Sequence, residues 1–128
     1  MKVINQKILD THDIQLMNNG IMVIHNFDKR EQTVEDQKRI IEIIGEMTGK
    51  KRIPMLHTFA QFSLPSKEVR EFWASDATCL YSKADAFIAA SVGQRIIGNF
   101  YMKIEKPTRP SRLFSDTTKA MEWLKAFI

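Results

Sequence analysis

The sequence is poor in the residue types that build recognisable catalytic or metal sites. Its 128 residues include one cysteine, five glycines and four prolines. The single cysteine, Cys79, excludes an internal disulfide and any paired-cysteine metal or redox site, and we interpret it as a small buried hydrophobic residue. The motifs G-x-S-x-G and H-E-x-x-H and a phosphate-binding glycine loop are absent. We therefore expect no cofactor and no metal.

Long apolar runs are missing as well. No segment approaches the roughly 20 apolar residues that cross a bilayer, and the first ten residues, MKVINQKILD, lack the apolar core of a signal peptide. We therefore expect a cytoplasmic protein. Hydrophobic residues make up 44% and charged residues 27% of the chain, as in soluble globular domains. The length suits one buried core, which predicts a single domain over residues 1–128.

Positive charge exceeds negative charge only modestly, with a net charge of +4. A nucleic-acid surface shows a denser basic stripe with aromatic residues between the basic ones. Here Glu105 interrupts one basic cluster and the aromatic residues follow core spacing. We interpret the basic residues as a solvated surface and expect no nucleic-acid partner. They gather at Lys50, Lys51 and Arg52, and at Lys103, Lys106, Arg109 and Arg112.

The first half of the chain predicts strands followed by one helix. Asn19-Gly20 lies between two apolar runs, which predicts a β-hairpin with a type I′ turn, and residues 2–9 are expected to form a further strand. A helix is predicted over residues 33–48, since Thr33 can cap its free amides and Gly49 supplies a left-handed stop. Residues 53–59 form a short apolar run that predicts a buried strand.

The second half alternates helices and strands. We expect a helix from about Ser66, a central strand over residues 84–90, a helix opened by a Ser91–Gln94 capping box, a short strand over residues 112–114 and a closing helix. The helix after Ser91 is expected to pack closely at Gly98 and to end before Pro107. Its predicted buried face consists of Ile96, Ile97, Phe100, Tyr101 and Ile104. Strands that alternate with helices predict an α/β fold with parallel pairing and right-handed crossovers.

In open parallel sheets, ligands bind beyond the carboxyl ends of the strands, where helix N-termini also point. Two loops, residues 57–66 and 91–95, are expected at that edge. Their hydroxyls, backbone amides and guanidinium suit an anionic group or a phosphoserine. The alternative is that the serines only cap helices and the arginine is a surface cation. The candidate ligand- or partner-binding residues are Ser63, Ser66, Ser91, Gly93, Gln94, Arg95 and Asn99.

The histidines give weaker indications. His12 and His25 lack metal-ligand spacing to another histidine, cysteine or carboxylate. His57 ends a strand, where it could be a hydrogen-bonded structural residue or a general base that acts with a loop serine.

The segments VREFWASDA, KADAFIAAS, QRIIGNFYMKIEKPTRP, RLFSD and AMEWL together resemble small bacterial proteins of the SpoIIAA-like group, relatives of STAS and Sec14-type domains. The resemblance covers about residues 53–124. It implies a mixed four- to five-stranded sheet with an N-terminal β-hairpin and about four flanking helices, without metal or redox cofactor. In STAS proteins that antagonise anti-sigma factors, a serine in the loop after the third main strand is phosphorylated. Ser63 and Ser66 occupy the matching loop, although the Asp-Ser-(Ser/Thr)-Gly stretch of that family is absent.

Three functions stay open at this point. The first is a non-catalytic regulatory or binding module, homodimeric or monomeric, that acts on a protein partner or a small anionic or apolar ligand. In it, phosphorylation of Ser63 or Ser66 would add nearly two negative charges and change an interface. The second is a small-molecule or lipid carrier. The third is a hydrolase-like enzyme that uses His57 and a loop serine.

Overall fold

A six-stranded mixed sheet forms the centre of the computed structural model, which describes residues 2–27, 30–60, 63–76 and 80–128. Cys79 lies outside the described residues. The strands are β1 (Val3–Ile8), β2 (His12–Met17), β3 (Met22–Asn26), β4 (Ile53–Phe59), β5 (Ser82–Ile88) and β6 (Ser111–Phe114), and they lie side by side in chain order. The first three strands pair antiparallel, and β3 to β6 pair parallel. The expected α/β class is confirmed. The expected four to five strands were too few, because β1 and β6 both join the sheet as edge strands.

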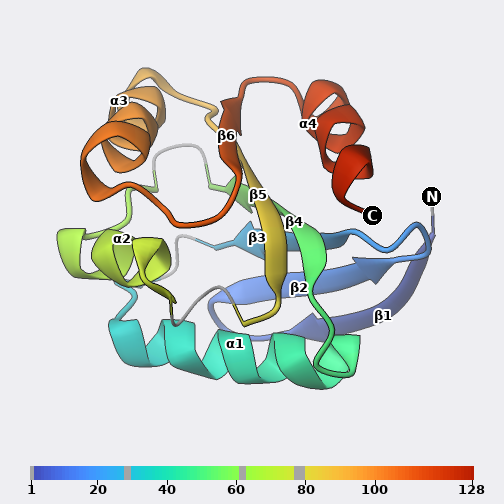
Figure 1. Ribbon diagram of the computed structural model, residues 1–128. Coiled ribbons are helices and arrows are strands. Elements are labelled where there is room, and N and C mark those ends of the chain that lie inside the picture. The colour runs from blue at the N-terminus through green and yellow to red at the C-terminus, as the bar shows by residue number, and fades with distance from the viewer. Residues whose placement is uncertain (1, 28–29, 61–62, 77–79) are drawn as a thin grey trace.

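The helices divide unequally between the two faces of the sheet (Figure 1). They are α1 (Val34–Thr48), α2 (Lys67–Ala74), α3 (Val92–Phe100), which continues into a π-helical turn, η2 (Tyr101–Glu105), and α4 (Thr117–Leu124), which ends in a 3₁₀ turn, η3 (Lys125–Phe127). Right-handed crossovers between parallel strands that always advance in one direction place every crossing helix on the same face. Accordingly α1, α2 and α3 cover one face, and α4, which follows the last strand, covers the other.

Alternate residues of each strand supply the two cores. On the α1 face, Met22 and Met55 pack against Ile40 and Ile44 of the helix. On the other face, Leu56 and the small residues of β5 pack against α4 through its buried residues Ala120, Met121 and Leu124.

The β2–β3 hairpin forms at Asn19-Gly20, but its turn differs from the predicted type I′. Only Gly20 has a positive φ, of 88°, whereas a type I′ turn requires it at both residues. The Asn19 side chain instead accepts a hydrogen bond from the amide of Ile21 at 3.2 Å, and the Gly20 amide donates to the Met17 carbonyl at 3.1 Å. The asparagine thus stabilises a longer turn through its side chain.

The predicted helix boundaries depend on capping, and the caps are present. Thr33 and Asp36 form a capping box at the start of α1, and Gly49 ends it with a φ of 64°. Ser66 caps α2, Ser91 caps α3 and Asp116 caps α4 through side-chain oxygens that accept backbone amides. These helices therefore begin where local sequence chemistry places them.

The buried face of α3 is not the one expected. Tyr101 is buried, as expected, but Ile96, Phe100 and Ile104 are exposed. The helix instead packs through Gln94, Gly98 and Tyr101. The reason is that α3 lies at the β6 edge of the sheet, where only a narrow side of the helix meets other elements (Figure 1). Within the described residues, no helix has the length and apolarity that crossing a membrane requires.

Replacement of Gly98 by alanine tests the close packing of α3 on β6. An added Cβ would meet Leu113 Cδ1 at 2.7 Å and Cδ2 at 3.0 Å, so we expect Gly98→Ala to lower the free energy of unfolding by about 1–2 kcal/mol. The matched control is Gly93→Ala in the same helix, where the nearest atom lies at 3.8 Å. We expect the control to be neutral or slightly stabilising.

Urea unfolding of both variants, alone and with Leu113→Val, provides the check. Valine removes the clashing methyl groups, so the cost of Gly98→Ala should shrink in that background. An unchanged cost would contradict the packing explanation.

Candidate functional site

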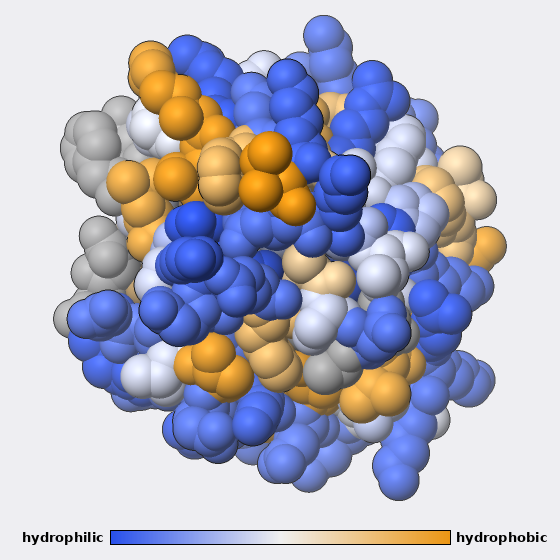
Figure 2. All heavy atoms as spheres, turned by 60° about the vertical axis from the view of Figure 1, so that its left-hand side comes forward, coloured by the Kyte–Doolittle hydropathy of each residue, from blue (hydrophilic) through white to orange (hydrophobic). Residues whose placement is uncertain are grey.

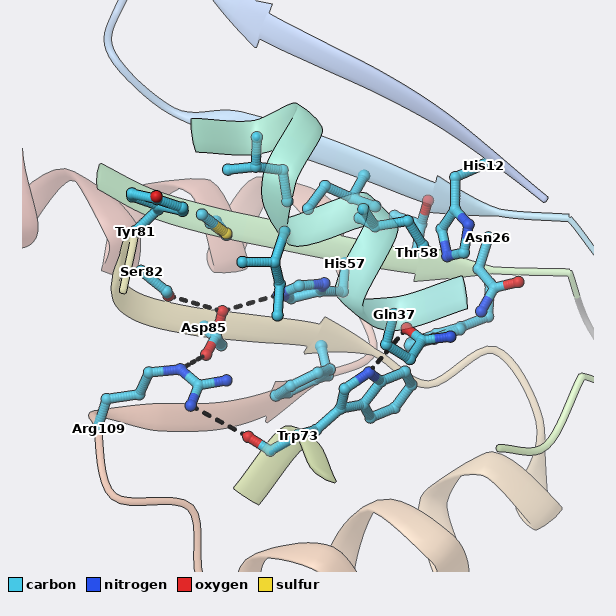
Figure 3. A pocket seen from close by; sticks show the side chains of 17 residues that line it. His12, Asn26, Gln37, His57, Thr58, Trp73, Tyr81, Ser82, Asp85 and Arg109 are labelled. Atoms are coloured by element: carbon cyan, nitrogen blue, oxygen red, sulfur yellow. Dashed lines mark hydrogen bonds and ion pairs between the residues drawn. The ribbon is translucent and has the colours of Figure 1, made fainter. Parts of the chain in front are cut away.

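A cavity of about 70 Å³ lies between the sheet and helices α1 and α2. Its apolar walls come from the inward face of α1 and from aromatic residues of β4, β5 and α2, and its polar side chains come from α1, β2, β3, β4, β5 and the segment before β6. Figure 3 shows these polar side chains converging from separate elements. They are His12, Asn26, Gln37, His57, Thr58, Ser82, Asp85 and Arg109. Apolar walls with a few convergent polar groups are typical of small-molecule sites.

Asp85 is the most buried charged group at this cavity, with an exposed fraction of 1%. Its carboxylate accepts a hydrogen bond from Ser82 Oγ at 2.9 Å and from His57 Nε2 at 2.8 Å, and it forms an ion pair with Arg109 Nε. Burial alone would raise the pKa of Asp85, but the hydrogen bond from His57 and the positive charge of Arg109 hold that pKa below its usual range. Asp85 is therefore ionised at neutral pH.

His57 is oriented by this carboxylate. Since Asp85 is ionised, Nε2 of His57 carries the proton that it donates. The imidazole stacks on the Phe87 ring, with 4.8 Å between centroids and 16° between planes. Its Nδ1 makes no hydrogen bond with any described residue. A fixed ring with one unused nitrogen can bind a ligand or transfer a proton.

His12 enters the cavity from β2, on the side away from Asp85 and Arg109 (Figure 3). It is 3% exposed, and its Nδ1 has no hydrogen-bond partner among the described residues. Burial, together with the nearby His57, lowers the pKa of His12 to about 4. At neutral pH the ring is therefore uncharged, and its buried nitrogen is an unsatisfied polar atom that a ligand or a water could satisfy.

Buried side-chain amides and an aromatic group complete the wall. Gln37 of α1 is 4% exposed and accepts a hydrogen bond from Trp73 Nε1 at 3.0 Å. Asn26 is also buried, and its Oδ1 accepts a hydrogen bond from Gln32. Phe59, Trp73 and Phe87 line this cavity and also a second one of about 40 Å³ beneath α3. The aromatic group thus separates the two cavities.

The loops that were expected to form the site come together, but Gln94 fills the space between them. Gln94 Nε2 donates to the carbonyls of Ala60 at 2.7 Å and Ser63 at 3.0 Å, and Oε1 accepts from the Ala90 amide at 2.8 Å. Gln94 therefore acts as a cross-link between the β4–α2 and β5–α3 loops. The predicted capping box forms only in part, because the glutamine bonds to Ala90 and not to Ser91.

The other predicted site residues divide by burial. The hydroxyls of Ser66 and Ser91 accept the amides of Val69 and Gln94, so both serines cap helices. Ser63 and Gly93 are half-buried, and Arg95 and Asn99 are exposed on α3. The structure does not bring these seven residues around one pocket, and the strand order of the described sheet never reverses, so this sheet has no topological switch point. Phosphorylation of Ser63 or Ser66 stays a prediction.

The pairing of His57 with a loop serine finds no geometric support. Neither Ser63 nor Ser66 lines the cavity that His57 enters, and neither forms a hydrogen bond with His57 in the part of the chain that the structure describes. His57 pairs with Asp85 instead. Within the same described residues, no group of three or more His, Cys, Asp and Glu side chains is placed to hold a metal ion.

Sequence reasoning missed Asp85, Arg109, His12 and Gln37 as site residues. One indication was available, since a charged residue inside the apolar run of β5 must be paired when the strand is buried. Its partners were not predictable, because Arg109 is 24 residues away and His57 lies on another strand.

Comparison with known proteins gives a family without an activity. The model of a family described as a domain of unknown function (DUF7793) matches residues 15–128. The chain belongs to this family. No curated protein matches it. A crystal structure described as a protein with unknown function from Arthrobacter sp. FB24 is 20% identical over 87% of this chain and 96% of that chain. Its TM-score of 0.29 is too low to support an argument.

The pH dependence of stability tests the environment of His12 in this DUF7793 domain. Unfolded histidine takes up a proton near pH 6.5, whereas folded His12 does so only near pH 4. Between these values the unfolded state binds more protons, so stability falls as the pH falls from 6.5 to 4, by about 3 kcal/mol from this residue. We expect His12→Gln to remove this part of the decline. Urea unfolding at pH 7.5, 6 and 4.5 measures it, and an equally steep decline in the variant would contradict the assignment.

Replacement of Asp85 by asparagine tests the buried ion pair. Asp85→Asn leaves the Arg109 guanidinium without its counter-charge, and we expect a loss of about 3–5 kcal/mol at pH 7. Asp10→Asn is the matched control, because Asp10 pairs with Arg30 on the surface, where such pairs contribute about 0–1 kcal/mol. Equal effects of the two substitutions in urea unfolding would show that the Asp85 cluster is not a stabilising centre.

Proposed function

We propose that this protein is a non-catalytic regulatory or binding module that holds a small uncharged molecule in the cavity between α1 and the sheet. The observation that carries the proposal is the buried Nδ1 of His12, which lacks a partner among the described residues and belongs to a side chain that lines the cavity. A buried polar atom without a partner costs about 1–3 kcal/mol. A ligand that hydrogen-bonds to it recovers that energy.

The charges of the lining favour an uncharged ligand. Asp85 and Arg109 neutralise each other, and His12 is neutral above pH 4. An ion that entered this cavity would lose its hydration without gaining an unpaired counter-charge. A molecule with both a donor and an acceptor suits the unused nitrogens of His12 and His57.

The volume favours a small molecule over a lipid. A cavity of about 150 Å³ holds benzene in another protein, and this one is about 70 Å³. It therefore encloses only a few non-hydrogen atoms, and an acyl chain does not fit. This supports the small-molecule form of the carrier alternative and not the lipid form.

A catalytic role has weaker support. Ser82 is the only hydroxyl that bonds to the Asp85–His57 pair among the described residues, and it donates to Asp85. The geometry therefore offers a base without an adjacent nucleophile. Kinship with SpoIIAA-like domains also stays a proposal, and what supports it is the order of the elements, with a mixed sheet flanked by helices.

Titration with acetamide and acetate tests the proposed site, because the two probes have the same shape and differ in charge. We expect acetamide at millimolar concentrations to shift the imidazole NMR signals of His12 and His57, since four non-hydrogen atoms bind weakly. We expect acetate to cause much smaller shifts. Equal shifts from both probes would contradict the uncharged specificity.

Two tryptophan substitutions in α1 supply the matched controls. Ile41 lines the cavity, so Ile41→Trp should occupy part of it and weaken acetamide binding at least tenfold. Ile43 is also half-buried but packs against the α1 core outside the cavity, so Ile43→Trp should leave binding unchanged. Binding that survives Ile41→Trp would place the acetamide elsewhere.

A further inference from the structure

Four large apolar side chains form a continuous exposed ridge along α3 and η2. They are Val92, Ile96, Phe100 and Ile104, with exposed fractions of 63%, 63%, 45% and 64%. Figure 2 shows hydrophobic side chains gathered across the upper part of this face, which α3 occupies in Figure 1. We name these four residues the α3 ridge. Scattered single apolar residues are normal on a surface, but a contiguous row indicates an interaction site.

The spacing of the ridge matches the ridges through which helices pack on one another. Its members recur every four residues, which is one of the two rows that interdigitate at helix–helix contacts. In an α-helix such a row drifts by about 40° at each step. The wider π-helical turn of η2, closed by the Lys106 amide on the Tyr101 carbonyl at 2.9 Å, reduces that drift at Ile104. The ridge therefore winds gradually around the helix from Val92 to Phe100 and less so from Phe100 to Ile104, over about 18 Å in all.

The centre of the ridge is held in place by α2. The Arg70 guanidinium lies 5.6 Å from the Phe100 ring centroid and pairs with Glu105 at 2.7 Å. Arg70 also donates to the Pro65 carbonyl. A rigid, half-exposed aromatic residue loses little conformational freedom on binding, as at the anchor of an interface.

The exposed charges that the ridge's own helical segment carries have one sign, and on the α2 side Lys67 and Glu71 form an ion pair at 3.6 Å beside Phe100 and Ile104. Arg95 and Lys103 are exposed on α3 and η2, and the exposed Lys106 directly follows η2. The only carboxylate between residues 92 and 106 is Glu105, whose side chain is 7% exposed and paired with Arg70. The ridge is thus apolar along its length and basic along its flank.

We propose that the α3 ridge docks an amphipathic helix of another protein, whose apolar residues pack on the ridge and whose carboxylates face Arg95, Lys103 and Lys106. This is a second site, independent of the cavity. Arg95 and Asn99, which the sequence suggested as partner-binding residues, lie on the helix that carries it. An amphipathic helix that docks on such a surface places its apolar anchor residues at spacings that include i and i+4.

The basic flank favours an acidic partner over a second copy of the chain. An antiparallel contact between two α3 ridges would bring Arg95 and Lys103 of both copies close together, and like charges across an interface cost affinity. A membrane fits less well. A hollow between α2 and η2, whose lining includes Lys67, Glu71, Phe100 and Ile104, suits a protruding side chain of a helix better than a flat bilayer surface.

The test uses two synthetic helical peptides in fluorescence anisotropy. Both carry leucine at the i and i+4 positions of one face, and their flanking positions are glutamate in one and lysine in the other. We expect the glutamate peptide to bind in the range of about 10–100 μM and the lysine peptide at least tenfold more weakly. Absence of binding by the glutamate peptide at about 1 mM, or equal binding of both peptides, overturns the proposal.

Surface variants then locate the contact without disturbing the core. Ile96→Ser with Ile104→Ser should weaken the glutamate peptide at least tenfold, and Arg95→Glu with Lys103→Glu should invert the preference between the peptides. The matched control is Ile8→Ser on β1, an isoleucine with an exposed fraction of 67%, which should change neither. Binding that survives the double serine variant overturns the proposal.

Two further measurements distinguish the other occupants. Sedimentation that shows a dimer in the wild type and a monomer in the double serine variant assigns the ridge to a second copy. Flotation with vesicles of 30% phosphatidylserine that is lost in the same variant assigns it to a membrane. Either result overturns the acidic-helix proposal, and a monomer that does not float supports it.

Discussion

The buried carboxylate of Asp85 is the interaction on which the described architecture depends most. It lies on β5, an interior strand next to the edge strand β6, and receives hydrogen bonds or an ion pair from β4, from β5 itself and from the segment that precedes β6. Arg109, held by this carboxylate, also donates to the Trp73 carbonyl at the end of α2. One ionised group thus joins two strands, a helix and a loop. Because Arg109 neutralises the charge of Asp85 within the core, the buried carboxylate does not depend on hydration by solvent.

The direction of the sheet decides where a site can form. Since the strand order runs from β1 to β6 without reversal, the right-handed crossovers place α1, α2 and α3 on one face. The sheet of the described residues therefore has no topological switch point. Space remains instead between α1 and the sheet, where polar residues such as His57 and Asp85 replace apolar ones and pack less completely. The same crowding of three helices on one face leaves α3 at the edge, with its apolar side exposed.

The two proposed sites would bind their ligands through different interactions, and they lie on opposite sides of the aromatic group of Phe59, Trp73 and Phe87. The cavity offers unsatisfied hydrogen-bonding atoms in a mostly apolar space whose charges are paired, which suits a small molecule. The α3 ridge offers apolar area with basic flanks, which suits a macromolecular partner. Trp73 lines the cavity and donates a hydrogen bond to Gln37. It belongs to α2, which also carries Arg70, the residue whose guanidinium lies over the Phe100 ring. The two sites therefore share a helix, although each proposal stands on its own residues.

Local sequence chemistry determined the elements of this protein. Thr33, Ser66 and Ser91 mark helix starts because a side-chain oxygen satisfies a free amide a few residues away. Gly20 and Gly49 mark a turn and a helix end because only such residues adopt a positive φ easily. Tertiary structure alone decided the rest. Periodicity shows that Ile96, Phe100 and Ile104 share a face but not whether another element covers it, and the partners of Asp85 come from segments that only the folded sheet brings together. Capping is a contact between neighbours in the chain, whereas burial and ion pairing are contacts between segments far apart in it.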